Sequence, residues 1–214
     1  MPGRHKHTLF AAAFTLLCIA GLISATSASA QSIWDLFEEG PSGRVEVAFD
    51  PKYSPKQIIV SFADRRLYFV REKGKALSYP IAVPRPQSRW AGVERVSMKR
   101  VNPPWTPTPS MRLENPQLPA FVPGGHPRNP LGVRALYLGN TTYRIHGTDA
   151  PSTIGSNVSK GCIRMFNEHA IELYDQTPTN TKVTVTYASF KAEPLDDAVQ
   201  ASNGSAQSST SRSR

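Results

Sequence analysis

The sequence predicts a single domain that is mostly β, because four stretches have the composition of strands. Residues 57–62 (QIIVSF) and 66–71 (RLYFVR) are rich in β-branched and aromatic side chains and flank a short turn. Residues 76–83 (ALSYPIAV) follow a second turn, and 182–187 (KVTVTY) alternate large apolar side chains with threonine, as a half-buried strand does. A chain of 214 residues has room for one such domain with a real core.

The N-terminal 30 residues have the three parts of a secretory signal peptide. Residues 1–7 are basic, 8–23 (TLFAAAFTLLCIAGLI) are apolar and uncharged, and the segment ends in Ala28-Ser29-Ala30 before Gln31. We expect cleavage after Ala30 and export to the periplasm or cell wall of a bacterium. The alternative is a retained membrane anchor, although the apolar run is near the lower length limit for crossing a bilayer.

The rest of the chain divides by composition. Residues 31–55 are predicted to be an arm or linker, with a short helix over 32–39 that ends before a Gly-Pro turn. Residues 56–188 are predicted to be the folded domain. The Ser-, Ala- and Gln-rich stretch 191–214 has almost no large apolar side chains, which predicts a disordered tail.

Residues 84–130 interrupt the strand pattern with eleven prolines and with Trp90 and Trp105. Proline is unsuited to strand and helix interiors, yet the aromatic residues are too many for a disordered linker. We expect an ordered excursion from the sheet that forms a lid over a site. Strands are predicted again at 135–138 and 141–145, the latter ending at His146.

A short helix is predicted over 167–176 (NEHAIELYDQ), ending at Thr177-Pro178. Asn167 is expected to cap its N-terminus.

The formal net charge is +9, and removing residues 1–30 takes away Arg4 and Lys6 and no acidic residue, which leaves +7. A basic exported protein is attracted to an anionic polymer or to a membrane surface. Nucleic acid is excluded as a partner by the expected compartment, whereas the bacterial wall and weak association with anionic lipids are not. The charge also fits a role in solubility alone.

Cys162 is the single cysteine of the predicted mature chain, so no internal disulfide is expected. A lone thiol in an oxidising compartment is a liability unless it has a chemical role. His146 lies 16 positions upstream, across a Gly- and Ser-rich loop that permits the two side chains to meet. An imidazole within hydrogen-bond reach can take the thiol proton and return it to a leaving amine.

Three neighbours of Cys162 fit acyl transfer. Gly161 lets the backbone turn, so that the amides of residues 160–162 can face a developing oxyanion. Arg164 offers a guanidinium suited to a carboxylate, with a surface salt bridge as the alternative. Ser159 either contacts substrate or stabilises the turn. The histidines and the cysteine lack metal-ligand spacing, so no metal or other cofactor is expected.

The order of histidine before cysteine argues against papain-like and NlpC-type peptidases, and the context differs from that of sortases. HGTDAPSTIGSNVSKGCIRM (residues 146–165) instead resembles the signature of the L,D-transpeptidase (YkuD-type) family, an HGT element followed by S-x-G-C-I-R. The stretches NPLGVRALYL (129–138) and NPPWTP (102–107) are also similar to that family. The resemblance covers about residues 56–187.

This resemblance implies a β-sandwich or barrel domain with a flap around Trp90–Trp105. It implies that Cys162 attacks a peptidoglycan tetrapeptide stem at its third residue, a diamino acid, and that carbapenems acylate the same thiol. His146 is the implied base, oriented by the carbonyl of Gly147. The motif positions Ser159, Lys160, Gly161 and Arg164 are implied to line the substrate and oxyanion site; many members have histidine where this chain has Lys160.

The acceptor of the acyl group stays open. A neighbouring stem gives a 3–3 cross-link, a wall-anchored protein gives attachment to the wall, and water gives an L,D-carboxypeptidase. A non-catalytic peptidoglycan-binding protein is the alternative outside enzymes, and the joint presence of His146, Cys162 and Arg164 argues against it.

Overall fold

The computed structural model describes residues 43–195. The predicted signal peptide, the helix over 32–39 and most of the predicted tail lie outside the described residues. Within them, no helix has both the length and the apolar character that crossing a membrane requires.

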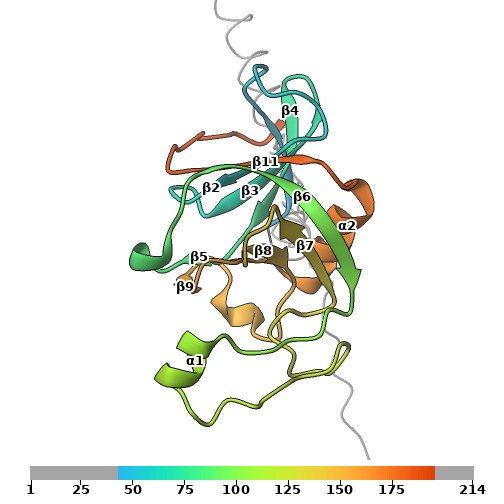
Figure 1. Cartoon of the computed structure of the whole chain (residues 1–214). Helices are drawn as coiled ribbons and strands as arrows, with labels where there is room; N and C mark the ends of the chain where they lie inside the picture. The colour runs from blue at the N-terminus through green and yellow to red at the C-terminus, as the bar shows by residue number, and fades with distance from the viewer. Residues whose placement is uncertain (1–42, 196–214) are drawn as a thin grey trace, which may run out of the picture. The chain divides into compact units, whose positions relative to one another are not determined.

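The fold is mostly β, as predicted (Figure 1). It is built on a nine-stranded mixed sheet in the order β1-β4-β3-β2-β11-β6-β7-β8-β10. The short strands β5 and β9 pair with each other in a separate two-stranded sheet. The strands are β1 (Val45–Ala48), β2 (Ile58–Ser61), β3 (Arg66–Glu72), β4 (Lys75–Pro80), β5 (Val83–Pro84), β6 (Gly92–Val101), β7 (Arg134–Leu138), β8 (Arg144–His146), β9 (Asn157–Ser159), β10 (Ile163–Arg164) and β11 (Lys182–Thr186).

The predicted meander forms from β2, β3 and β4, which pair antiparallel in sequence order. Arg65 and Gly74 take positive φ values of 50° and 86° at the two turns, which lets the chain reverse tightly. The last strand, β11, does not lie at an edge. It inserts between β2, to which it is parallel, and β6, to which it is antiparallel.

β6 corrects the predicted excursion over 84–130. The structure places Gly92–Val101 in the centre of the sheet, between β11 and β7. This stretch contains no proline, so its backbone donors are available to both neighbours. The excursion is therefore shorter, residues 102–133, and it carries the helix α1 (Pro109–Glu114), which the sequence did not predict (Figure 1). Thr108 caps α1 by accepting the amide of Met111 at 3.3 Å.

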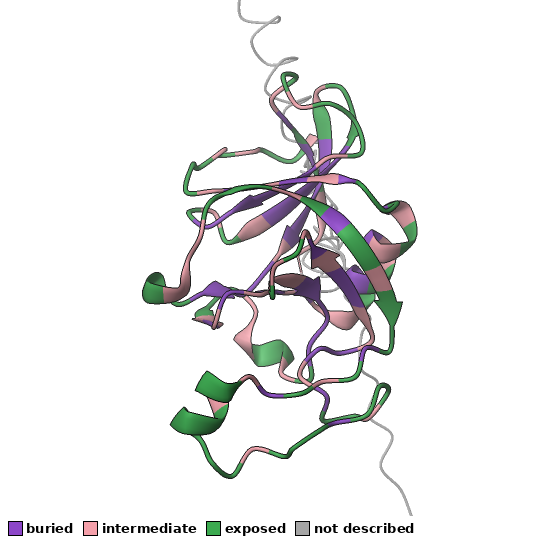
Figure 2. Ribbon diagram, in the orientation of Figure 1, coloured by how far each residue is buried: buried purple, intermediate pink, exposed green. Residues whose placement is uncertain are grey.

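Buried apolar side chains lie on both faces of the meander strands, and Figure 2 shows buried stretches along these strands. The larger cluster includes Ile58, Val60 and Leu173, the last of these from α2 (Asn167–Gln176). The smaller cluster includes Ile59 and Tyr68 on the other face of the same strands. Each large side chain buried in this way stabilises the fold by about 1.5–3 kcal/mol.

The helix over 167–176 has the predicted bounds, but Asn167 does not cap it. Asn167 is the first helical residue, and the preceding Phe166 makes no side-chain cap. Residues 191–195, at the start of the predicted tail, are among the described residues, and part of this stretch contacts the domain. The amide of Ala48 donates to the carbonyl of Glu193 at 3.1 Å, and Pro194 bridges to Val47 beside β1. Phe190, just before this stretch, and Ala192 within it pack against the smaller apolar cluster.

Candidate active site

Two short strands bring together the parts of the site that are distant in sequence. β10 pairs parallel with β8, so that Arg164 lies opposite His146 in the register. Cys162 immediately precedes β10. The amide of Met165 also donates to the carbonyl of His146 at 2.8 Å, which fixes the register. His146 and Cys162 line one cavity of about 220 Å³, together with Arg144 and Arg164.

His146 is buried and its tautomer follows from one contact. Its Nδ1 lies 2.6 Å from the carbonyl oxygen of Gly147. A carbonyl only accepts, so Nδ1 carries the proton and Nε2 has a free lone pair. Burial lowers the pKa of His146 to about 3, opposed by the Gly147 contact and assisted by the charges of Arg164 and Arg144. The imidazole is therefore a neutral base at physiological pH.

Cys162 is a free, half-buried thiol. Its Sγ contacts the carbonyl oxygen of Thr142 at 3.7 Å. Burial raises the pKa of Cys162, while the guanidinium groups of Arg144 and Arg164 act in the opposite direction. The resting cavity thus contains a neutral thiol and a neutral imidazole. Attack by this thiol requires proton transfer to an imidazole as the carbon–sulfur bond forms.

Ser159 stabilises the turn that presents Cys162. Its hydroxyl donates to the carbonyl of Cys162 at 2.5 Å and accepts the amide of Gly161 at 3.4 Å. This geometry favours the turn role over direct contact with substrate. Because the amide of Gly161 donates to Ser159, the amides of Lys160 and Cys162 remain as the candidates for an oxyanion site.

Gly161 has a φ of 130°, and a Cβ at this position would lie 2.5 Å from the ring of Tyr143. Trp90 also packs against this turn. Its ring stacks on that of Tyr143, with centroids 4.5 Å apart and an interplanar angle of 7°. The Trp90 Nε1–H donates to the carbonyl of Gly161 at 2.9 Å. Trp90 therefore supports the nucleophile turn, and its assignment to the flap was wrong. Sequence reasoning missed Tyr143 because nothing local to it indicates a distant partner.

Gly147 is required by a different contact. A Cβ there would lie 2.1 Å from Oδ1 of Asn167. That oxygen accepts the amides of Thr148 at 3.1 Å and Val133 at 3.3 Å, and the Asn167 Nδ2 donates to the carbonyl of Thr148 at 2.9 Å. Asn167 thus fixes the segment after His146, a role that replaces the predicted cap.

Lys160 joins the nucleophile turn to the excursion. Its Nζ lies 2.6 Å from a carboxylate oxygen of Glu114, the last residue of α1. Residues of α1 and its cap, Thr108, Ser110 and Met111, also line the catalytic cavity. The excursion is therefore positioned to cover this site, as a lid does.

Comparison with known proteins shows the family of the chain. The family model described as the L,D-transpeptidase catalytic domain (YkuD) matches residues 55–185. The chain belongs to the YkuD family. The predicted resemblance is confirmed, and the family consists of enzymes that act on the peptide stems of peptidoglycan.

Individual relatives agree with the family assignment. A probable L,D-transpeptidase of Escherichia coli K12, ErfK/SrfK, is 40% identical over 140 residues, which are 61% of this chain and 44% of that protein. The putative L,D-transpeptidase YkuD of Bacillus subtilis is 35% identical over 136 residues, 64% of this chain and 69% of that protein. The chain spans less than half the length of ErfK/SrfK.

A solved structure has the same fold. The structure titled "Ldtfm-avibactam carbamoyl enzyme" has a TM-score of 0.51 and 20% identity over 65% of this chain and 51% of that one. At this identity the similarity concerns the fold, a sheet-rich, sandwich-like arrangement.

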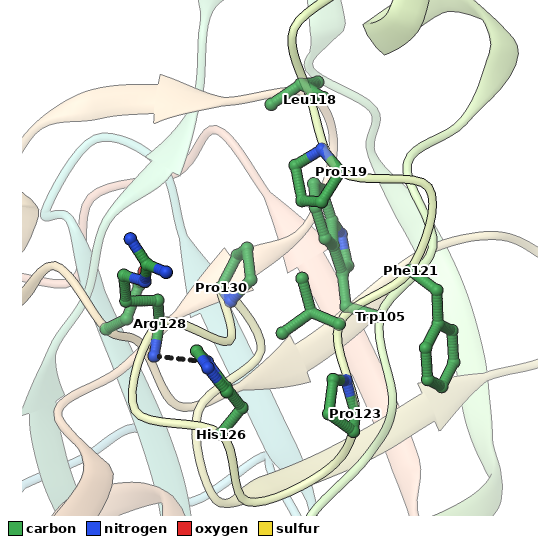
Figure 3. Close-up of a pocket in the computed structure, with 10 residues that line it drawn as sticks. Trp105, Leu118, Pro119, Phe121, Pro123, His126, Arg128 and Pro130 are labelled. Atoms are coloured by element: carbon green, nitrogen blue, oxygen red, sulfur yellow. Dashed lines mark hydrogen bonds between the residues drawn. The ribbon is translucent and has the colours of Figure 1, made fainter.

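The YkuD domain of this chain has a second, larger cavity of about 540 Å³, lined by residues of the excursion and by Asp149 (Figure 3). Trp105 and Pro130 line both this cavity and the catalytic one. The excursion around it is held by Asn129, whose Nδ2 donates to the carbonyls of Pro103 at 2.8 Å and Pro123 at 3.1 Å. Trp105 was assigned to the flap, and this placement fits that assignment.

Proposed function

We propose that the chain is an exported L,D-transpeptidase whose Cys162 forms a thioester with peptidoglycan tetrapeptide stems. The observation that carries the proposal is the joint presence of Cys162 and His146 in one cavity, with His146 in the tautomer that leaves Nε2 free. Export rests on the signal-peptide pattern of residues 1–30.

In the first half-reaction, Cys162 Sγ attacks the carbonyl carbon between the third residue and the terminal D-Ala. Its proton passes to Nε2 of His146 and then to the nitrogen of the leaving D-Ala, as the carbon–nitrogen bond breaks. The amides of Lys160 and Cys162 are the candidates to stabilise the tetrahedral oxyanion. The products are free D-Ala and a thioester on Cys162.

In the second half-reaction, a side-chain amine of a neighbouring stem attacks the thioester carbon. His146 takes a proton from the amine and returns one to the departing Sγ, which restores the thiol. The product is an amide between two diamino acids, a 3–3 cross-link. An amine on a wall-anchored protein gives attachment of that protein by the same step.

Incubation of the purified protein with tetrapeptide muropeptides, followed by mass spectrometry, tests the proposal. We expect dimers joined through two diamino acids, and a covalent carbapenem adduct on Cys162. Tripeptide monomers without dimers would assign the L,D-carboxypeptidase reaction instead. If neither product nor adduct forms, the proposal fails.

Cys162→Ala is the matched control, and it is expected to lose all turnover while the thermal unfolding transition stays unchanged. Residual turnover in this variant would contradict the assignment of Cys162 as nucleophile. Cys162→Ser separates loss of the nucleophile from loss of the side chain's shape, since a hydroxyl keeps that shape but is a much weaker nucleophile near neutral pH.

A further inference from the structure

The second cavity, of about 540 Å³, has the size and lining of a ligand site, yet the reaction proposed above does not use it. Sites for small organic ligands commonly have volumes of about 300–1,000 Å³ and an apolar lining with a few polar groups. The lining of this excursion cavity is mostly apolar and includes Trp105 and Phe121. It also carries three ionisable side chains, those of His126, Arg128 and Asp149.

Two aromatic rings of the excursion cavity have no aromatic or cationic partner. Within residues 43–195, Trp105 and Phe121 make no ring–ring or cation–π contact, whereas every other aromatic side chain that is at least partly exposed makes one. The Phe121 side chain is 55% exposed. Trp105 is held by its backbone, which donates to Val122 at 2.9 Å and accepts from it at 2.8 Å. Trp105 therefore offers a fixed ring to a ligand.

The polar side chains of this cavity offer both donors and an acceptor. Nδ1 of His126 accepts the amide of Arg128 at 3.2 Å, so the neutral imidazole carries its proton on Nε2 and can donate it. Among the residues that the structure describes, neither Arg128 nor Asp149 forms an ion pair, although Asp149 attracts Arg164 at longer range. The guanidinium and the carboxylate carry opposite charges that offset each other, which favours an uncharged polar ligand.

A pyranose sugar matches both kinds of lining. One face of such a ring presents C–H bonds with a slight positive charge, and these pack on the negatively charged face of an indole. Sugar hydroxyl groups donate to a carboxylate, and an acetamido oxygen accepts from a guanidinium or an imidazole. An anionic polymer would place its charge beside Asp149, and a cationic peptide would place its charge beside Arg128.

The position of the excursion cavity fits a sugar that carries a stem peptide. Trp105 and Pro130 line both this cavity and the one that contains Cys162, so the two cavities are adjacent. The carbonyl that Cys162 is proposed to attack belongs to the third residue of the stem, and three extended residues span about 10 Å. A stem that reacts at Cys162 can therefore extend past Trp105 and bring its sugar to the second cavity.

We propose that the excursion cavity is a glycan subsite that binds an uncharged, N-acetylated amino sugar of the peptidoglycan strand. Trp105 stacks on the apolar face of the sugar, Phe121 adds apolar contact, and His126, Arg128 and Asp149 bind its polar groups. The subsite holds the strand while the stem reacts. Assignment to a peptidoglycan sugar rests on the function proposed above, whereas binding of an amino sugar requires no turnover.

Oligosaccharides without any peptide test the subsite in the absence of reaction. The full chain with Cys162→Ala is titrated with the tetramer of β-1,4-linked N-acetylglucosamine, and the equally linked glucose tetramer is the control without acetamido groups. NMR follows the indole N–H signal of Trp105, which Trp105→Phe assigns. We expect a saturable shift with the first tetramer and about 10-fold weaker binding of the second. No shift of this signal, or equal affinities for the two tetramers, would overturn the proposal.

Cavity variants and matched controls locate the bound sugar. Phe121→Ser and Arg128→Gln should each weaken binding of the N-acetylglucosamine tetramer by about 10-fold. Leu113→Ser, at an exposed residue of α1, and Arg71→Gln, at an exposed residue of β3, make the same kinds of change outside both cavities and should bind like the parent chain. Thermal unfolding identifies the variants that are folded. Parent-like affinity in both folded cavity variants would show that the sugar binds elsewhere.

A kinetic comparison connects the subsite with the proposed reaction. The ratio of kcat/KM for the disaccharide-bearing tetrapeptide to kcat/KM for the free tetrapeptide measures the contribution of the sugar. We expect a ratio of about 10 in the wild type and close to 1 in Arg128→Gln, since contacts remote from the reacting bond contribute to kcat/KM. A wild-type ratio of 1 would contradict a role of the subsite in the reaction. If neither substrate is turned over, the proposed function fails, and binding of the tetramer still decides whether the cavity is a sugar site.

Discussion

Strand pairing holds one wall of the catalytic cavity, whereas a side-chain ion pair joins the other wall to the nucleophile turn. β8 and β10 pair in the sheet, and Arg164 exchanges two further backbone hydrogen bonds with Ala82, at 2.9 and 3.0 Å. The excursion 102–133 is joined to the nucleophile turn by the ion pair of Lys160 and Glu114, whose carboxylate side chain is 57% exposed. The reacting groups therefore lie on the rigid wall, formed by β8 and β10. The excursion 102–133 is the weaker wall, and it governs access to them.

Among changes to the two walls, the largest effect is expected from Gly161→Ala, which alters the rigid wall. The new Cβ would collide with Tyr143. Alanine would also have to adopt a φ of 130°, which side-chain-bearing residues rarely do. We expect kcat to fall by about 100-fold, because displacement of the thiol by about 1 Å is enough for such a loss. Steady-state kinetics and thermal unfolding measure the two consequences.

Gly155→Ala is the control for this variant, since Gly155 has a φ of 86° but no atom within 4 Å of the added Cβ. It should destabilise the protein by about 1–3 kcal/mol through backbone strain and leave kcat within about threefold of wild type. Equal losses of kcat in the two variants would show that strain, and not the contact with Tyr143, sets the position of Cys162.

Trp90→Phe tests the support beneath the same wall with a smaller change. Phenylalanine can still stack on Tyr143 but cannot donate to the carbonyl of Gly161. We expect a loss of about 1–3 kcal/mol in stability and about 10-fold in the rate at which a carbapenem acylates Cys162. An unchanged acylation rate would limit Trp90 to a packing role.

Glu114→Gln removes the ion pair with Lys160 that joins the excursion to the nucleophile turn. An ion pair this exposed is worth about 0.2–1 kcal/mol, so the melting temperature should hardly change. We expect KM for the tetrapeptide to change by up to about fivefold while kcat stays constant. Glu72→Gln, which removes the exposed ion pair with Lys75, is the matched control and should leave KM unchanged. A large fall in kcat would place the ion pair in the chemistry itself.

The smallest effect is expected from pH. Because burial lowers the pKa of His146 to about 3, the imidazole stays neutral from pH 8 down to pH 5. The carbapenem acylation rate should show no transition near pH 6.5 in this range. The unfolded chain binds the proton more tightly than the fold does, so the contribution of His146 to stability is lost as pH falls from 6.5 towards 3. A rate midpoint near 6.5 would contradict the neutral-base assignment.

Local patterns predicted much of the fold, and distant contacts account for the errors. The meander and the helix over 167–176 followed from alternation and turn residues near in sequence. The sequence did not predict β6, because prolines on both sides of this proline-free segment led to the assignment of all of 84–130 as one excursion. The roles of Trp90 and Asn167 were missed because their partners, Tyr143 and Thr148, are distant in sequence. The motif placed Cys162 and His146 in one candidate site, but it gave no reason to include Arg144, whose position depends on the strand pairing.

The central position of β11 sets an order on the folding of this domain. β11 supplies the hydrogen-bonded connection between the meander side of the sheet and the side that carries β6, β7, β8 and β10. Within residues 43–195, β11 is the last strand in the sequence, so it is made after the others. Until it emerges during synthesis, the two halves of the sheet each expose an unpaired edge. The cavity that contains Cys162 lies on the side that carries β8 and β10, and β11 completes the pairing of that side with the meander strands within the sheet.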